Sequence, residues 1–214
     1  MKGAGKYAEE LKSLVKKFAK EAKATPIPKQ DPLRAMVRAI FSFDTTDAKA
    51  EEALATVDRE FVDINELRVA TELEVHDLIG SKYPQIVKRA AMISTIFNHV
   101  FEKEGVLTFD RLAAMKKAEM RPFLRAMPGM TPYVEAYVAL VSFEIAAMPL
   151  DDMSLAVLAE SGAVDAGATI EEAQKFVEGH TKPDELNDLF AGLRRQAQEA
   201  FVPPVDEAKS RRKK

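Results

Sequence analysis

The amino-acid sequence predicts an all-α protein, and three observations support this class. Apolar residues recur at helical spacing along nearly the whole chain of 214 residues. No alternating run of β-branched residues is long enough to indicate a strand. The breaks between periodic segments are short and carry the residue types that begin and end helices. We therefore expect about eleven helices joined by short connections.

The first expected helix covers residues 7–23, where lysines surround an apolar face, and the proline-rich residues 25–28 end it. Asp31 then supplies an N-cap, and Pro32 stands at the first position of the next helix. Thr46 starts the helix that follows. The remaining expected helices cover 63–70, 72–79 (ended by Gly80), 85–103 (ended by Gly105), 108–116, 118–127, 132–147, 151–161, 170–178 and 183–201.

Composition excludes several classes of function. The chain has no cysteine, which excludes disulfides, thiolate metal sites, iron–sulfur clusters and cysteine nucleophiles. His76, His99 and His180 lack the spacing of metal ligands, so neither a metal nor another cofactor is expected. No apolar run approaches the ~18 residues of a membrane helix, and the N-terminus lacks the apolar core of a signal peptide. A cytoplasmic protein without membrane contact is expected.

Charge is distributed unevenly. The formal net charge is -3, yet residues 1–29 carry eight lysines against three glutamates, a net +5. Residues 206–214 add a net +3, so residues 30–205 carry -11. Basic ends favour contact with a polyanion, whereas an acidic body opposes it.

The most specific segment is residues 123–140, FLRAMPGMTPYVEAYVAL. A helix is predicted to end at Met127, a tight Pro-Gly turn follows, and Thr131 and Pro132 begin the next helix as N-cap and first residue. Free amides at such a helix start, with the helix dipole behind them, form a site for an anion such as a DNA phosphate.

This segment resembles the helix-hairpin-helix of the endonuclease III-like DNA glycosylase superfamily, whose pattern is roughly L-P-G-V-G-R-K-T-A. Three further motifs occur in the family's order. Residues 31–47 are similar to N-P-F-x-x-L-[IV]-x-x-x-L-S-A-Q-[AT]-T-D, residues 78–93 to I-G followed by K-A-x-x-I, and residues 150–153 to V-D-T-H. The resemblance covers about residues 30–162 and implies an all-α, two-lobed fold that binds double-stranded DNA between its lobes.

The resemblance implies a catalytic role for Asp151, which matches the family's aspartate near the sugar, with Asp152 as a rival one residue away. Tyr133 stands where bifunctional members carry a lysine nucleophile, so no Schiff base forms there and no lyase activity is expected. At the same time, an aspartate at a helix start is an ordinary N-cap, and a tyrosine at this position can simply pack in the core.

DNA contacts are implied at the hairpin residues Gly129, Met130, Thr131 and Val134 and at Asp44. The hairpin departs from the family pattern, because Thr131 replaces the second glycine and Pro132 has no N–H. Asp44 replaces a glutamine that fills the gap left by a flipped base, and it adds negative charge toward DNA. The family's four-cysteine cluster loop is absent.

These observations predict a basic N-terminal helix and linker over 1–30, a glycosylase-like domain over 31–203 and a basic tail over 204–214. Within the domain we expect a central barrel lobe over about 44–146 and a second lobe from 31–43 plus 151–203, to which the N-terminal helices add. The leading hypothesis is base-excision repair: a hydrolase that cleaves the N-glycosidic bond of a damaged or mismatched base. The alternative is a catalytically silent relative that binds DNA or a protein partner, as the acidic body and Asp44 suggest. The sequence leaves the oligomeric state open.

Overall fold

A computed structural model describes residues 4–21 and 28–200 of the chain. In these two ranges it contains twelve α-helices, one short 3-10 helix and no strand, which confirms the all-α class. The elements are α1 (Ala4–Glu21), α2 (Pro32–Ser42), α3 (Asp47–Glu60), α4 (Ile64–Val69), α5 (Glu72–Ile79), α6 (Ile86–Glu104), α7 (Asp110–Ala113), α8 (Lys117–Arg125), α9 (Pro132–Phe143), α10 (Asp152–Glu160), α11 (Ile170–His180), η1 (Pro183–Glu185) and α12 (Leu186–Glu199).

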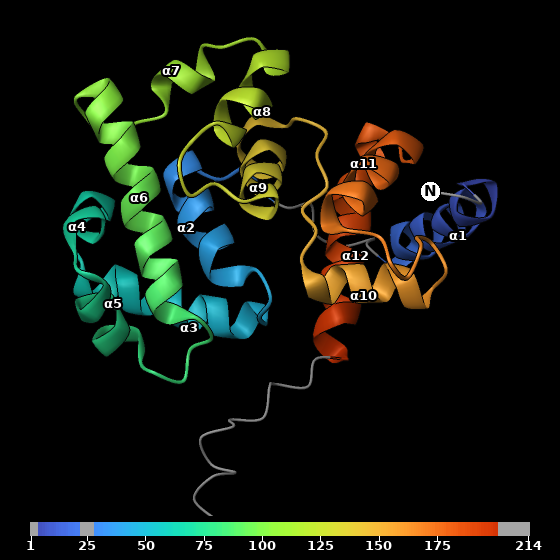
Figure 1. The fold of residues 1–214 in the computed structure, drawn as a ribbon, viewed down its shortest axis with the longest axis horizontal. Coiled ribbons are helices and arrows are strands. Elements are labelled where there is room, and N and C mark those ends of the chain that lie inside the picture. The colour runs from blue at the N-terminus through green and yellow to red at the C-terminus, as the bar shows by residue number, and fades with distance from the viewer. Residues whose placement is uncertain (1–3, 22–27, 201–214) are drawn as a thin grey trace, which may run out of the picture.

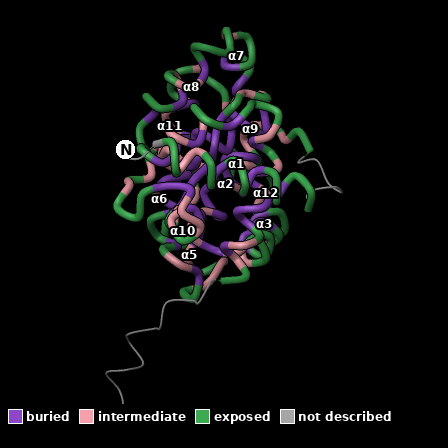
Figure 2. The backbone as a smooth tube through the Cα atoms, turned by 90° about the vertical axis from the view of Figure 1, so that its right-hand side faces the viewer, coloured by how far each residue is buried: buried purple, intermediate pink, exposed green. Residues whose placement is uncertain are grey.

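The helices form two groups (Figure 1). Helices α2 to α9 make one group, in which α2 packs against α3, α6 and α9. Helices α1, α10, α11 and α12 make the other, in which α12 packs against both α1 and α10. Buried segments lie in the interior of the molecule, and exposed segments lie outside (Figure 2). The main apolar core takes side chains from both groups.

Helix α2 lies in the first group, whereas our division of the sequence placed residues 31–43 with the second lobe. The reason is its apolar face: Met36, Val37, Ile40 and Phe41 are buried, and α2 packs most extensively against α9. The exact boundary between the lobes stays a prediction.

Five of the predicted helix ends are confirmed by their caps. Asp31, Thr46 and Thr131 each accept a hydrogen bond from a backbone amide three residues on, and prolines occupy the first helical position after Asp31 and Thr131. Gly80 and Gly105 end α5 and α6 with positive φ angles of 99° and 73°, a conformation that glycine adopts without strain.

The helix predicted over 132–147 is shorter in the structure. It ends at Phe143, because Glu144 adopts a left-handed conformation with φ 52° and ψ 41°. The amide of Ile145 then closes the helix end by donating to the Ala139 carbonyl at 3.0 Å. The following residues to Asp151 form a link between the two groups. Helix α11 fixes this link, since Glu178 accepts from the Met148 amide and Gln174 donates to the Met148 carbonyl, both at 2.9 Å.

Some sequence predictions fall where the structure is not described. The predicted tail at 204–214 lies outside the described residues, as does part of the predicted N-terminal segment, whose first helix is α1. Among the described helices, none is long and apolar enough to cross a membrane.

Candidate functional site at the junction of the two helix groups

Asp151 lies where the link from α9 enters α10. Its Oδ1 accepts the Ser154 amide at 2.9 Å, so it is the N-cap of α10, as the sequence predicts. Its side chain is only 1% exposed. A carboxylate this deeply buried needs partners for both of its oxygens.

The first partner of the second oxygen comes from the turn between α2 and α3. Asp44 in this turn has a φ of 48°, and its amide donates to Asp151 Oδ2 at 3.0 Å. In return, Asp44 Oδ1 accepts the amide of Asp152 at 2.9 Å. Burial raises the pKa of Asp44, and the charges of Asp151 and Asp152 raise it further. Asp44 thus joins the two helix groups through two hydrogen bonds, one donated to Asp151 and one accepted from Asp152.

The second partner is Arg194 of α12. Its Nη1 donates to Asp151 Oδ2 at 2.7 Å, and its Nη2 donates to Asp47 Oδ1 at 2.7 Å. The same Nη2 lies 3.1 Å from the Ser42 carbonyl oxygen and 2.9 Å from that of Thr45. The side chain is 4% exposed. Burial lowers the pKa of Arg194, but nearby Tyr133, Asp151 and Asp47 raise it by more, so it stays charged.

A second buried arginine donates to backbone carbonyl oxygens next to and within the same turn. Arg89 of α6 donates to the carbonyl oxygens of Ile40, Phe43 and Pro84, with its guanidinium over the Phe43 ring. Both Arg89 from α6 and Arg194 from α12 therefore donate hydrogen bonds to the turn that carries Asp44. These hydrogen bonds help to hold Asp44 at a positive φ, a conformation that costs energy in a non-glycine residue.

Tyr133 lies in the first turn of α9 and is 4% exposed. Its hydroxyl is 3.2 Å from Ser42 Oγ, and its ring packs against Phe43 and Tyr137 with centroids 6.2 Å away. Burial raises the pKa of the Tyr133 phenol far above its ordinary value, so the hydroxyl stays protonated at neutral pH. The side chain packs in the core and also faces a pocket.

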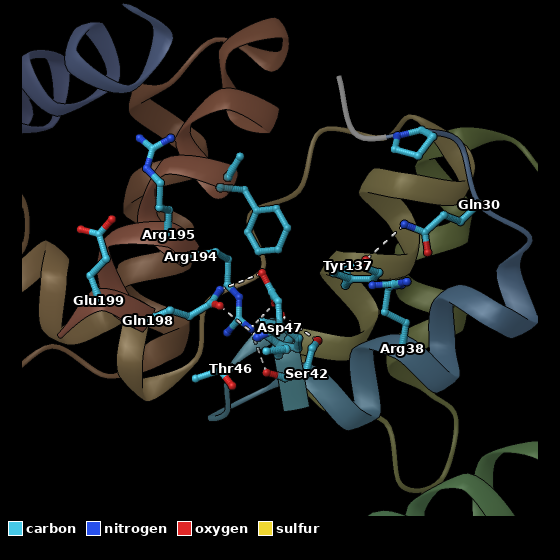
Figure 3. Close-up of a pocket in the computed structure, with 15 residues that line it drawn as sticks. Gln30, Arg38, Ser42, Thr46, Asp47, Tyr137, Arg194, Arg195, Gln198 and Glu199 are labelled. Atoms are coloured by element: carbon cyan, nitrogen blue, oxygen red, sulfur yellow. Dashed lines mark hydrogen bonds and ion pairs between the residues drawn. The ribbon is translucent and has the colours of Figure 1, made fainter. Parts of the chain in front are cut away.

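This pocket has a volume of about 810 Å³ and lies between α12 and the helices α2, α3 and α9. Figure 3 shows Gln30, Arg38 and Tyr137 on one wall, Arg195 and Gln198 on the other, and Arg194 reaching toward the middle. The lining also includes Ser42, Asp47, Tyr133 and Phe190, but among the described residues Asp151 does not line it. Arg194 thus stands between the pocket and Asp151.

Two rings and two polar side chains define the character of the pocket. The Tyr137 and Phe190 rings meet edge to face, 5.8 Å between centroids. Gln30 donates to the Tyr137 hydroxyl at 3.3 Å, which leaves its carbonyl oxygen available as an acceptor. Arg38 pairs with Glu51 through one nitrogen. A pocket with flat apolar surfaces and a few polar groups suits a flat heterocyclic ligand.

The hairpin begins α9 as the sequence predicts. Gly129 has a φ of 80°, and a Cβ there would lie 3.3 Å from Thr95 Cγ2, so both conformation and space favour glycine. Gly129 is exposed, and Met130 and Thr131 are half-buried. Val134 is buried, and its amide already donates to Thr131 Oγ1 at 3.3 Å. DNA contacts at these residues stay predictions.

The structure brings Asp151, Asp44 and Tyr133 to one junction and adds Arg194, Asp47 and Ser42, which our reading of the sequence missed. One signal marks Arg194: it follows Phe190 by four residues, on the buried face of α12. A charge on a buried helix face indicates a buried partner of opposite charge. Within the described residues there is no cluster of His, Asp and Glu that suits a metal ion.

No protein-family model and no curated protein sequence matches this sequence. Solved structures do match. An endonuclease III trapped on DNA aligns with a TM-score of 0.71 at 13% identity, over 95% of this chain and 92% of that one. A Clostridium acetobutylicum 8-oxoguanine glycosylase/lyase aligns with 0.70 at 17% identity, over 92% and 71%. An H. pylori 3-methyladenine DNA glycosylase aligns with 0.67 at 14% identity, over 92% and 99%.

These similarities define the class of fold. The chain has the two-lobed helical fold of the helix-hairpin-helix DNA glycosylases. The structural matches confirm the resemblance that the four sequence motifs indicate. The sequence contains no cysteine, so the chain has this fold without a four-cysteine cluster loop.

Proposed function

We propose that this protein is a monofunctional DNA glycosylase, which removes a damaged or mismatched base from double-stranded DNA without cutting the strand. The observation that carries the proposal is the pocket of about 810 Å³ between the two helix groups, with Tyr133 at its wall and the Asp151 junction behind it. The fold shared with structures of DNA-bound glycosylases supports it.

The pocket suits an extruded base. Its volume lies within the usual range for small-molecule sites, about 300–1,000 Å³. The rings of Tyr137 and Phe190 offer apolar surface to a base, while Gln30 and Arg38 offer hydrogen-bonding groups to its edge. Since the glycosidic bond is out of reach inside the base stack, the target nucleotide must leave the duplex before cleavage.

The tyrosine at position 133 supports the proposal that the protein does not cut the DNA strand. A lyase needs an amine that forms a Schiff base with the sugar, and a buried, protonated phenol cannot supply one. In this proposal Tyr133 shapes the pocket, and hydrolysis depends on a carboxylate that stabilises the developing positive charge of the sugar.

That carboxylate is Asp151. Because its side chain is 1% exposed and held by Asp44 and Arg194, contact with the sugar requires the junction to open when DNA binds. The hairpin over Gly129–Thr131 would hold a backbone phosphate, and the lysines of α1 would add non-specific attraction.

The test is single-turnover base release from duplexes that carry a panel of oxidised, deaminated, alkylated and mismatched bases. Wild-type protein should release one of them, with strand breaks appearing only after alkali. Asp151→Asn should slow release by at least a hundredfold, while the matched control Asp152→Asn retains it. Equal rates for wild type and Asp151→Asn would refute the assignment, and the reverse pattern would move it to Asp152.

A second candidate function is favoured by the same junction. Arg194 neutralises Asp151 and separates it from the pocket, and Asp44 adds negative charge, as expected in a silent relative that binds DNA or a protein. Binding to a duplex with an abasic-site analogue, together with no release from any member of the panel, would support this candidate.

A further inference from the structure

Asp151 and Arg194 form a buried ion pair at the junction, and both side chains make several further hydrogen bonds. Asp151 accepts three hydrogen bonds, from Ser154, Asp44 and Arg194, and Arg194 reaches four acceptors. Both side chains are nearly fully buried, at 1% and 4% exposure. Removing one partner of a buried ion pair leaves the other as an uncompensated buried charge.

The other charged or titratable groups around Asp151 do not replace Arg194. Asp44 in the α2–α3 turn and Asp152 of α10 are acidic and oppose a charge on Asp151. The phenol of Tyr133 on α9 is neutral, and Asp47 of α3 binds Arg194 itself. Arg89 of α6 acts from a distance, since its own hydrogen bonds go to backbone carbonyls.

We propose that Arg194 is the positioning residue of Asp151: it supplies the counter-charge of the buried carboxylate, and it ties Oδ2 to the turn that carries Asp44. Among the described residues Oδ1 accepts only the Ser154 amide, so it keeps the greater capacity for a further contact. The consequence for base release rests on the proposed function, whereas the pairing of Arg194 with Asp151 is a property of the free protein.

The geometry requires an arginine. One guanidinium nitrogen binds Asp151 while the other binds Asp47 and the carbonyl oxygens of Ser42 and Thr45. A lysine carries an equal charge on a single nitrogen and cannot bridge these groups. Arg194→Lys therefore separates the two roles, because it keeps the counter-charge and loses the bridge, while Arg194→Met removes both.

The first experiment measures thermal unfolding of the full chain at pH 7.5. Arg194→Met should lower Tm by about 10 °C, as expected for breaking a buried ion pair in a chain of this size. Asp151→Asn and the double variant Asp151→Asn/Arg194→Met complete a double-mutant cycle. The Tm loss of the double variant should be smaller than the sum of the two single losses by at least about 4 °C, because the two side chains act through one shared interaction.

Two variants control this result. Arg195→Met removes the neighbouring, half-exposed arginine that pairs with Glu21, and it should change Tm by no more than about 3 °C, both alone and in the Asp151→Asn background. Arg194→Lys keeps the counter-charge, so it should fold even if Arg194→Met does not.

Additive Tm losses of Arg194→Met and Asp151→Asn would overturn the proposal and leave Arg194 as a packing residue. A second readout concerns base release, which Arg194→Lys should slow at least tenfold at pH 7.5 while its pH profile keeps the wild-type shape. If wild-type protein releases no base from the panel, the proposed function fails, and the double-mutant cycle still decides the role of Arg194.

Discussion

Gly192 in the middle of α12 has a neighbour that leaves no room for a side chain. A Cβ at this position would lie 2.2 Å from Cγ, 2.5 Å from Cδ1 and 2.6 Å from Cβ of Phe18. Phe18 is 1% exposed and belongs to the face of α1 that packs on α12. We predict that Gly192→Ala destabilises the protein, although alanine is the better helix former.

The size of the effect follows from two opposing terms. Alanine gains about 1 kcal/mol over glycine in a helix interior. Against this, the clash involves the base of the Phe18 ring, so a change of rotamer cannot relieve it and α1 must move away from α12. Overpacking of this kind costs about 1–3 kcal/mol, and more where a whole helix is displaced. The net loss should be about 2 kcal/mol, or about 4–8 °C in Tm.

The assay is reversible thermal or urea unfolding, with Gly179→Ala as the matched control. Gly179 is an exposed helical glycine of α11, and a Cβ there would meet no atom within 4 Å. Gly179→Ala should therefore raise stability slightly, by up to about 1 kcal/mol. Combining Gly192→Ala with Phe18→Ala should remove most of the penalty of the first change, because the clashing ring is gone. A Tm for Gly192→Ala at or above that of wild type would refute the packing of α1 on α12.

Two further predictions concern the junction. Tyr133→Lys places an amine at the wall of the pocket, where burial and nearby Arg194 lower the pKa of an ammonium. This variant should form a covalent adduct with abasic-site DNA on borohydride reduction. An adduct formed equally by wild-type protein would contradict the role that we give to Tyr133. Asp44→Asn should raise stability at pH 7, because the raised pKa of Asp44 means that its charge costs stability above the ordinary Asp range. Since asparagine tolerates a positive φ and keeps the acceptor for the Asp152 amide, the gain should fade as pH falls toward about 4, and a gain unchanged with pH would be inconsistent with this cause.

Local signals made most of the fold predictable from the sequence. A proline after Asp31 and another after Thr131 place two helix starts, and Gly80 and Gly105 place two helix ends, because each acts within one helical turn. The end of α9 escaped prediction, since Glu144 adopts a left-handed conformation without the glycine that usually marks one.

The site was predictable only in part. Asp151 and Asp44 each belong to a sequence motif, and the N-cap role of Asp151 follows from its place before a helix. Their contact joins residues 107 positions apart, and Arg194 joins Asp47 across 147. Periodicity within one helix does not specify which helices meet, so the hydrogen bonds of Arg194 to the turn could be found only from the structure.

The proposal that the pocket receives an extruded nucleotide can be tested by binding to DNA that contains an abasic-site analogue, compared with plain duplex over a salt titration. We expect tighter binding to the abasic duplex at every salt concentration, with affinity for both duplexes falling as salt rises because phosphate contacts release counterions. Equal affinity for the two duplexes, or no binding even at low salt, would contradict the claim that this pocket receives a nucleotide extruded from DNA.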